Sequence, residues 1–333
     1  MIIRQPHYYS DFRCLAGDCP DSCCQEWDVL VDRESALRYL SLPGALGDSL
    51  RSHLYQEDGN YYLQITDRRC PMWQADGLCR IQAQLGHEAL CRVCQEFPRL
   101  RHEYGDFVEL GLELSCPEAA RLIFSSSALP MQEYTVEGGE EPEYDRECMR
   151  ILLRSRKEAL NILERRPLQE AMPLLLLYGY RIQDELDGGE MVLWNEEQEL
   201  RFAAEMASEA QWADLTEFYR SLELLTPRWE ARLRHPTPDS CFPADLSKMI
   251  CCAIERYWLQ AVSDYDLVCR VKMILAGALL VGHLGGDLVE TAQLYSKEID
   301  NSAENVEAIL DGTYTHPALT DRNLLGLMKR IWT

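Results

Sequence analysis

The stretch that decides the fold of the N-terminal region, residues 70–99, reads CPMWQADGLCRIQAQLGHEALCRVCQEFPR. Its four cysteines follow the spacing C-x8-C-x11-C-x2-C, and glycine and proline break the intervening sequence into short pieces. Clustered thiols in a reducing compartment are more often metal ligands or redox groups than disulfides. The stretch therefore predicts a small, irregular domain organised around its cysteines.

More cysteines lie on both sides of this stretch. Cys14, Cys19, Cys23 and Cys24 form C-x4-C-x3-C-C upstream, and Cys116 lies downstream, so nine of the fourteen cysteines fall within the first 116 residues. Thiolate is the preferred ligand of zinc and of iron-sulfur clusters, and closely spaced pairs let one turn present two sulfurs to a metal. We expect metal binding from this array rather than the packing of small buried hydrophobes.

The spacing leaves the metal and the number of sites open. Cys23 and Cys24 are adjacent, and neighbouring side chains of an extended segment point in opposite directions, so this pair suits two different partners. Four thiolates satisfy one zinc ion or one [4Fe-4S] cluster, which leaves other cysteines for a second site or for packing. A C-x3-C-x2-C pattern is not formed, because Glu26 stands where the third cysteine would be. We therefore do not predict 5'-deoxyadenosyl radical chemistry from the motif.

The residues around the array predict short strands and helices up to about residue 124. We expect strands at 27–31, 61–66 and 107–114, and helices at 33–40, 80–85 and 89–97. The segment 125–147 then changes character: its second part, QEYTVEGGEEPEYDRE, has seven acidic residues and one arginine. This composition predicts an acidic linker or a solvated surface loop.

Helical periodicity dominates the rest of the chain. Apolar residues recur at three- and four-residue spacing in runs of ordinary helix length. These runs are 148–165, 168–187, 200–207, 212–225, 245–262, 265–281, 287–300 and 303–310. The predicted fold class is thus α+β: a small irregular cysteine-rich N-terminal domain over 1–124, the acidic linker over 125–147, and an all-α helical bundle over 148–333.

The charge balance excludes some partners. The chain has 33 basic and 55 acidic residues and a net charge of -22, which argues against nucleic acid and against an anionic membrane surface. Its longest apolar run, residues 172–180, is about half as long as a membrane span requires. Residues 1–12 lack the pattern of a secretory signal, so we expect a cytoplasmic protein.

Three blocks of sequence resemble the flagellin lysine-N-methylase family. They are PHYYSDFRCLAGDCPDSCCQEWDVLVD over 6–32, the stretch over 70–99 quoted above, and LELSCPEAARL over 112–122. The central block also resembles zinc- or iron-chelating cysteine domains whose pattern ends in a cysteine, an aromatic residue and a proline; these are Cys94, Phe97 and Pro98 here.

The resemblance implies an enzyme that transfers methyl groups from S-adenosylmethionine to lysine side chains of flagellin. It also implies a cysteine-ligated iron-sulfur cluster, with zinc as the alternative metal. The positions that match the family pattern are Cys19, Cys23, Cys24, Cys70, Cys79, Cys91, Cys94 and Cys116. No motif assigns catalytic or cofactor-binding residues in the C-terminal half. The alternative is a non-enzymatic zinc- or iron-binding scaffold or metal carrier.

Lysine methylation sets a chemical requirement that the sequence meets only in general terms. The lysine must react as a neutral amine, so its pocket needs acidic or hydroxyl groups that attract the ammonium and accept its proton. The glycines of residues 277–286 do not form a G-x-G-x-x-G motif after a strand, so S-adenosylmethionine enters only through the resemblance. We interpret Cys251 and Cys252 as ordinary helix residues, and we do not include His87 or His102 among the metal ligands.

Overall fold

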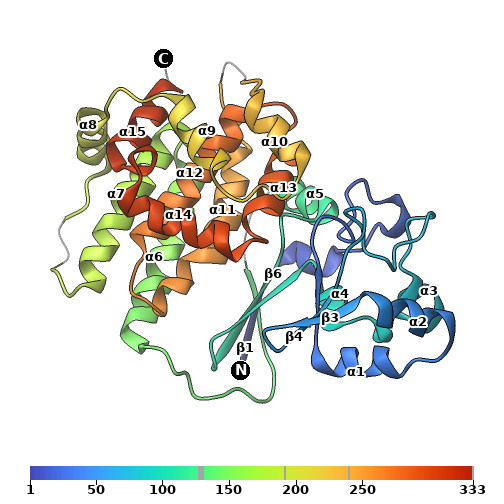
Figure 1. Ribbon diagram of the computed structural model, residues 1–333. Helices are drawn as coiled ribbons and strands as arrows, with labels where there is room; N and C mark the ends of the chain where they lie inside the picture. The colour runs from blue at the N-terminus through green and yellow to red at the C-terminus, as the bar shows by residue number, and fades with distance from the viewer. Residues whose placement is uncertain (127–130, 191–192, 239–240, 332–333) are drawn as a thin grey trace.

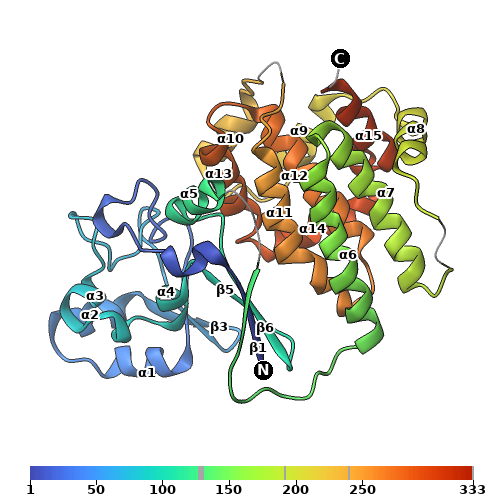
Figure 2. The same ribbon diagram turned by 180° about the vertical axis from the view of Figure 1, so that it is seen from behind.

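The computed structural model describes residues 1–126, 131–190, 193–238 and 241–331. Its buried apolar residues form two separate clusters, a small one within residues 29–91 and a large one that includes the helical bundle. Figure 1 shows the cysteine-rich part beside the bundle, with the strand β1 and its neighbours at the junction, and Figure 2 shows the same arrangement from behind.

The small cluster forms around a three-stranded antiparallel sheet of order β2-β4-β3. Its strands are β2 (Val29–Val31), β3 (Leu54–Glu57) and β4 (Asn60–Leu63). The helices of this part are α1 (Arg33–Ser41), α2 (Gly44–His53), α3 (Arg80–Leu85) and α4 (Arg92–Glu96), with short 3-10 turns η2 (Ala16–Asp18) and η3 (His87–Ala89). Asp32 caps α1 by accepting from the Ser35 amide at 2.9 Å, and its second oxygen accepts from the Arg92 amide of α4. One aspartate thus joins two segments that are distant in sequence.

A second sheet joins the N-terminus to later parts of the chain. Its order is β5-β6-β1-β7, with β1 (Ile2–Pro6) parallel to β6 (Phe107–Leu112) and antiparallel to β7 (Met131–Thr135). The hairpin partner of β6 is β5 (Arg99–Glu103). Strand β7 lies within the predicted acidic linker, of which residues 127–130 lie outside the described residues. The 3-10 turn η1 (His7–Asp11) follows β1 directly.

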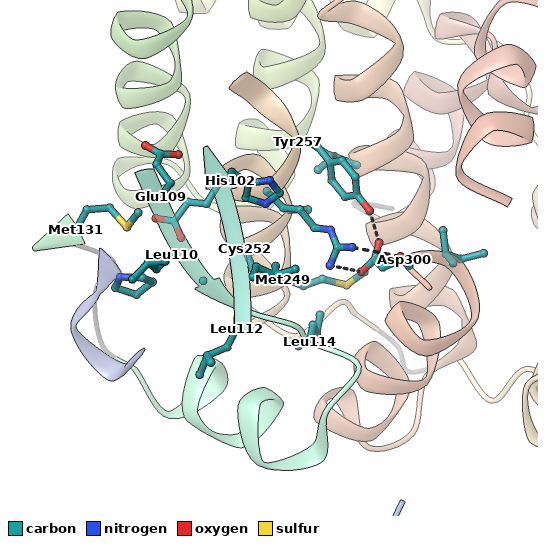
Figure 3. A pocket seen from close by; sticks show the side chains of 18 of the residues that line it. His102, Glu109, Leu110, Leu112, Leu114, Met131, Met249, Cys252, Tyr257 and Asp300 are labelled. Carbon is teal, nitrogen blue, oxygen red and sulfur yellow. Dashed lines mark hydrogen bonds and ion pairs between the residues drawn. The ribbon is translucent and has the colours of Figure 1, made fainter. Parts of the chain in front are cut away.

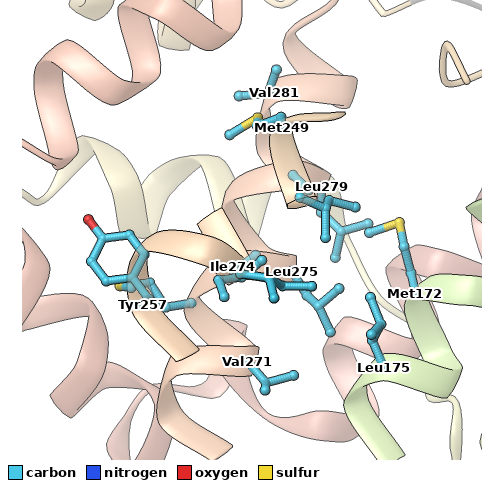
Figure 4. Close-up of a cluster of buried hydrophobic side chains, with 14 of the residues drawn as sticks. Met172, Leu175, Met249, Tyr257, Val271, Ile274, Leu275, Leu279 and Val281 are labelled. Atoms are coloured by element: carbon cyan, nitrogen blue, oxygen red, sulfur yellow. The ribbon is translucent and has the colours of Figure 1, made fainter. Parts of the chain in front are cut away.

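The helical part is built around one helix that is buried almost all round. In α12 (Val268–Leu284) every residue except His283 is buried, as expected for a helix that is apolar on every face. Figure 4 shows Val271, Leu275 and Leu279 of this helix packed among side chains of neighbouring helices. The surrounding helices are α5 (Pro117–Ser125), α6 (Arg146–Arg165), α7 (Leu168–Leu186), α8 (Glu196–Met206), α9 (Trp212–Arg220), α10 (Pro227–Arg234), α11 (Leu246–Tyr257), α13 (Leu288–Ile299), α14 (Ala303–Thr315) and α15 (Asp321–Arg330), with the 3-10 turns η4 (Trp258–Val262) and η5 (Pro317–Leu319).

The predicted α+β fold class, with irregular N-terminal structure and a C-terminal helical bundle, is confirmed. The core of the bundle continues into the region before residue 124, because Tyr8, Phe107 and Ile123 belong to the large cluster. The domain boundaries at 124 and 147 stay a prediction. Within the described residues, the helices are too short or too polar to cross a membrane.

Candidate functional site

Five of the predicted ligands gather around the small apolar core. The Cys70 amide donates to the Cys24 carbonyl at 2.8 Å, and Cys79 pairs with Trp73 in an isolated β-bridge. Burial raises the pKa of Cys70 to about 12, and charges on the neighbouring thiols Cys24, Cys79 and Cys91 add to the effect. A side-chain hydrogen bond to Cys94 lowers the pKa of Cys91. We call these five cysteines the inner thiol group.

The other three predicted ligands, together with Cys14, form an outer thiol group nearer the bundle. Burial raises the pKa of Cys116 to about 11, and charges on Cys19 and Cys14 contribute. The pKa of Cys23 is raised well above its usual value, first by a hydrogen bond with Cys24 and then by burial. The adjacent Cys23 and Cys24 thus contact each other and join the two groups, and the expectation that this pair serves two different partners stays a prediction.

Three of these thiols sit where backbone N–H groups favour the charged form of a thiol. Cys79, Cys91 and Cys116 are the N-cap residues of α3, α4 and α5. Burial raises the pKa of Cys79, but hydrogen bonds from the backbone of Gln82 and Ile81 oppose that rise. Helix N-termini are a common setting for reactive or metal-binding thiolates. The sequence folds so that short helices start at cysteines.

The donor chemistry of the array suits a thiophilic metal, but the side chains do not form a closed site as they lie. All fourteen cysteines are free thiols. Within the described ranges, no three His, Cys, Asp or Glu side chains are placed so that they could hold one metal ion. The eight predicted ligands and the identity of the metal therefore stay predictions.

Helix α13 binds the loop that carries the outer thiols. Asp21, between Cys19 and Cys23, accepts from Lys297 Nζ at 2.6 Å and from Gln293 Nε2 at 2.9 Å. The Lys297 side chain is only 3% exposed, and its ammonium also lies 5.1 Å from the centre of the Trp27 ring. Gln293 donates in addition to the Ser115 carbonyl at 2.6 Å, beside Cys116. These contacts, which we call the α13 clamp, fix the outer thiol group against the bundle.

Other residues of the same half of α13, Tyr295 and Ile299, line a pocket between the larger sheet and the bundle. Strands β5 and β6, turn η1 and helices α11, α12 and α13 all contribute to its walls. The centre of a water molecule can occupy a volume of about 60 Å³ in this pocket. A single water needs roughly 10–15 Å³ by this measure, so the pocket accommodates several waters or a slender side chain.

Glu255 of α11 lines this pocket with a carboxylate oxygen that has no partner. Its Oε1 atom is buried and makes no hydrogen bond among the described residues. Burial raises the pKa of Glu255 to about 7, the positive charge of Arg156 opposes this rise, and the negative charge of Glu109 adds to it. A buried carboxyl group that titrates near neutral pH is a typical candidate for a general base.

The other acidic groups of the pocket are already paired. Glu109 forms a bidentate ion pair with the buried Arg156, with Oε2 2.7 Å from the nearer guanidinium nitrogen. Asp300, at the end of α13, accepts from the Tyr257 hydroxyl at 2.6 Å and lies 4.0 Å from Arg256. Figure 3 shows the Tyr257 hydroxyl directed at Asp300, with a dashed line for their hydrogen bond. This pairing leaves Glu255 as the carboxylate of the pocket wall with a free oxygen.

Two further polar groups line the same pocket. Tyr8 is one of them, and this residue is only 4% exposed. Burial raises the pKa of Tyr8 well above its usual value, and charges on Cys252 and Glu255 raise it further. The Nε2 atom of His102 is buried without a partner, and burial together with the charge of Arg256 lowers the pKa of this imidazole. A neutral His102 is therefore expected at pH 7.

No sequence motif marks this pocket. Glu255, Tyr8 and Asp300 belong to no motif, and only their packing between the sheet and the bundle brings them together. His102 was kept out of the predicted ligand set, and it lines this pocket. Cys252, interpreted as an ordinary helix residue, lines it as well.

Comparisons with known proteins give partial matches. The chain is 30% identical over 144 residues to the lysine-N-methylase of Salmonella choleraesuis strain SC-B67, a match that covers 41% of this chain and 36% of that protein. The lysine-N-methylase of Salmonella typhimurium strain LT2 gives the same identity and coverage. The flagellar biosynthetic protein FliU of Salmonella muenchen is 29% identical over 141 residues, or 40% of this chain and 83% of that protein.

The match thus spans about a third of the length of the two lysine-N-methylases. No family model matches the chain, and no solved structure matches it. The similarities confirm the predicted resemblance to the flagellin lysine-N-methylase family.

Proposed function

We propose, with the resemblance to the lysine-N-methylases as the premise, that the protein methylates lysine side chains of a flagellar protein and that the pocket beside Glu255 receives the lysine. The free, buried Glu255 Oε1 is the observation that carries this assignment. A lysine side chain is a slender aliphatic chain with a cationic end. The pocket offers matching chemistry, with apolar walls that include Met249, Met273 and Leu112 and one unpaired carboxylate.

The proton balance of the reaction assigns a role to each polar group. An ammonium has no free electron pair, so the lysine must lose a proton before its nitrogen can attack a methyl group. Glu255 in its ionised form attracts the ammonium and takes that proton, because its pKa of about 7 lies near the working pH. The Tyr8 hydroxyl and the neutral His102, which line the same pocket, would hydrogen bond the amine and fix its direction.

S-adenosylmethionine would supply the electrophilic methyl group as a sulfonium. As the N–C bond forms, the S–C bond to the methyl group breaks and S-adenosylhomocysteine leaves with the bonding electron pair. The space of about 60 Å³ is too small for the whole nucleoside, so the pocket holds the amine and not the donor. We assign no residues to the binding of the donor.

We also propose that the thiol array binds a metal, as an iron-sulfur cluster or as zinc, through cysteines of the inner and outer groups. The metal would order the loops that α13 holds through Asp21. Because α13 also contributes Tyr295, Ile299 and Asp300 to the pocket, order in the array supports the shape of the pocket. Free thiols suit a reducing compartment, and we place the reaction in the cytoplasm.

Methyl transfer itself tests the proposal. Protein reconstituted anaerobically with iron and sulfide, or with zinc, is incubated with labelled S-adenosylmethionine and flagellin, and label on lysine is located by mass spectrometry. We expect transfer by the wild type and at least a roughly hundredfold loss in Glu255→Gln. Glu158 is partly exposed and pairs with Arg165 away from the pocket, so Glu158→Gln serves as the matched control and is expected to retain the wild-type rate. A colourless zinc protein that labels no flagellin lysine would instead support the alternative function as a metal-binding scaffold.

A further inference from the structure

A groove adjoins the lysine pocket along the same sheet. It is bounded by the β5–β6 hairpin, by residues 139–145 and by the chain from η4 to Tyr265, and it offers an open space of about 1000 Å³. His102 is a wall residue of both the groove and the pocket, so the two cavities are neighbours at this residue. We call this feature the acidic groove.

The walls of the groove carry an excess of negative charge. Glu103, Glu140, Glu141, Glu143 and Asp145 all line it. Glu103 pairs with its neighbour Arg101, and Glu141 pairs with Arg146. Glu140 and Glu143 have no ion-pair partner among the described residues. A ligand that supplies positive charge would therefore find carboxylates that the chain itself does not neutralise.

The acidic segment is held in place, and aromatic rings stand beside it. The Glu140 amide donates to the Gly105 carbonyl at 3.1 Å, and the Tyr144 hydroxyl donates to Asp106 at 2.7 Å. Tyr104 and Tyr144 meet edge to face and both line the groove. Such rings can pack against the aliphatic stems of lysine or arginine side chains while carboxylates meet their charges.

We infer that the acidic groove binds an extended segment of the protein substrate, in which further cationic residues flank the lysine that enters the pocket. This inference rests on the proposed function, because the groove lies beside the site where that function places the lysine. The observations that carry it are the wall residue His102 that the two cavities share, the free oxygen of Glu255 in the pocket, and the unpaired charges of Glu140 and Glu143 in the groove. Its consequence is selection of lysines in a cationic sequence context.

Binding can be tested without the methyl donor, and so without catalysis. Fluorescence anisotropy would follow a labelled peptide of serine, glycine and three spaced lysines, with a glutamate-for-lysine peptide as the comparison. The double variant Glu140→Gln/Glu143→Gln is expected to weaken binding of the lysine peptide about fivefold at low salt. The double variant Glu209→Gln/Glu307→Gln removes two exposed charges elsewhere and is expected to leave the affinity unchanged. Added salt is expected to reduce the difference.

The outcomes separate this inference from the proposed function. Equal affinity of wild type and the groove variant, or equal binding of the glutamate peptide, would overturn the inference. Methyl transfer to the small substrate Nα-acetyl-lysine methylamide gives the second readout, because it enters the pocket without flanking charges. We expect its KM to be unchanged in the groove variant, while Glu255→Gln abolishes its turnover. A groove variant that raises this KM as much as the Kd of the peptide would show a general loss of structure and would also overturn the inference.

Discussion

The α13 clamp makes a quantitative prediction about stability. The Asp21 side chain is 16% exposed, whereas the Lys297 side chain is 3% exposed. Removing Asp21 therefore leaves a more deeply buried charge than removing Lys297 does. Breaking a buried ion pair by removing one partner costs about 3–5 kcal/mol, because the remaining charge is left without compensation. Asp21→Asn leaves the ammonium deeply buried beside Trp27 and is expected to lower the free energy of unfolding by about 3–4 kcal/mol.

The converse change is expected to cost less. Lys297→Met leaves a carboxylate that still accepts from Gln293 and reaches solvent, so we expect a loss of about 2 kcal/mol. The combined variant is expected to lose less than the sum of the two, because the residues contact each other. Arg228→Gln serves as a control, because it breaks an ion pair between α10 and Glu290 of α13. Both side chains of this pair are about half exposed, so the expected cost is under about 1 kcal/mol.

Urea unfolding followed by tryptophan fluorescence measures these differences. The unfolding midpoints of two variants can be compared if the slope of the unfolding free energy against urea concentration is the same in both. Both clamp variants are also expected to reduce the metal content after reconstitution, because they release the loop of the outer thiol group. If Asp21→Asn and Lys297→Met were no more destabilising than Arg228→Gln, the clamp would not hold the two parts together and the reasoning from burial would be refuted.

Three further predictions follow from the pocket and the array. Because burial raises the pKa of Glu255 from 4.5 to about 7, the folded protein keeps a proton that the unfolded chain releases, and the free energy of unfolding falls as pH rises between these values. Glu255→Gln is therefore expected to be more stable than wild type at pH 8 but not at pH 5. An equal difference in stability at both pH values would contradict the assigned pKa. Glu109→Gln leaves the Arg156 charge buried and is expected to cost about 3 kcal/mol in thermal or urea unfolding; a neutral effect would show that the pair is dispensable. Cys79→Ser and Cys94→Ser are each expected to lower metal content by elemental analysis, with Cys148→Ser as the matched control, and full loading of both variants would remove them from the ligand set.

Periodicity and composition predicted most of the helices because those signals are local. The run 287–300 corresponds to α13, and the run 168–187 corresponds to α7. Strand β1 was not predicted, since its hydrogen bonds go to β6 about a hundred residues away. Strand β7 was assigned to the acidic linker because of the acidic composition of that segment, and only its pairing with β1 makes it a strand. Helix α5 was also missed, although Pro117 at its first position is a common start signal.

The candidate site likewise has one part that the sequence predicts and another that only the tertiary packing creates. The cysteine array could be predicted because thiols are rare and their spacing carries chemical meaning. Glu255 could not, because a glutamate beside the buried Ile254 in an amphipathic helix ordinarily faces solvent. Its burial arises from the packing of the sheet against α11, which no pattern within α11 encodes. The pairing of Asp21 with α13 likewise joins residues 276 positions apart.

The central claim is that Glu255 accepts the proton of the substrate lysine. The pH dependence of methyl transfer, measured as kcat/KM for wild type and Glu255→Gln with the same lysine substrate, tests it most directly. The wild-type rate is expected to rise as pH increases through about 7, where Glu255 ionises, and the variant is expected to be at least about a hundredfold slower and to lack that rise. A variant with the wild-type rate and the same pH profile would show that another group accepts the proton and would contradict the account.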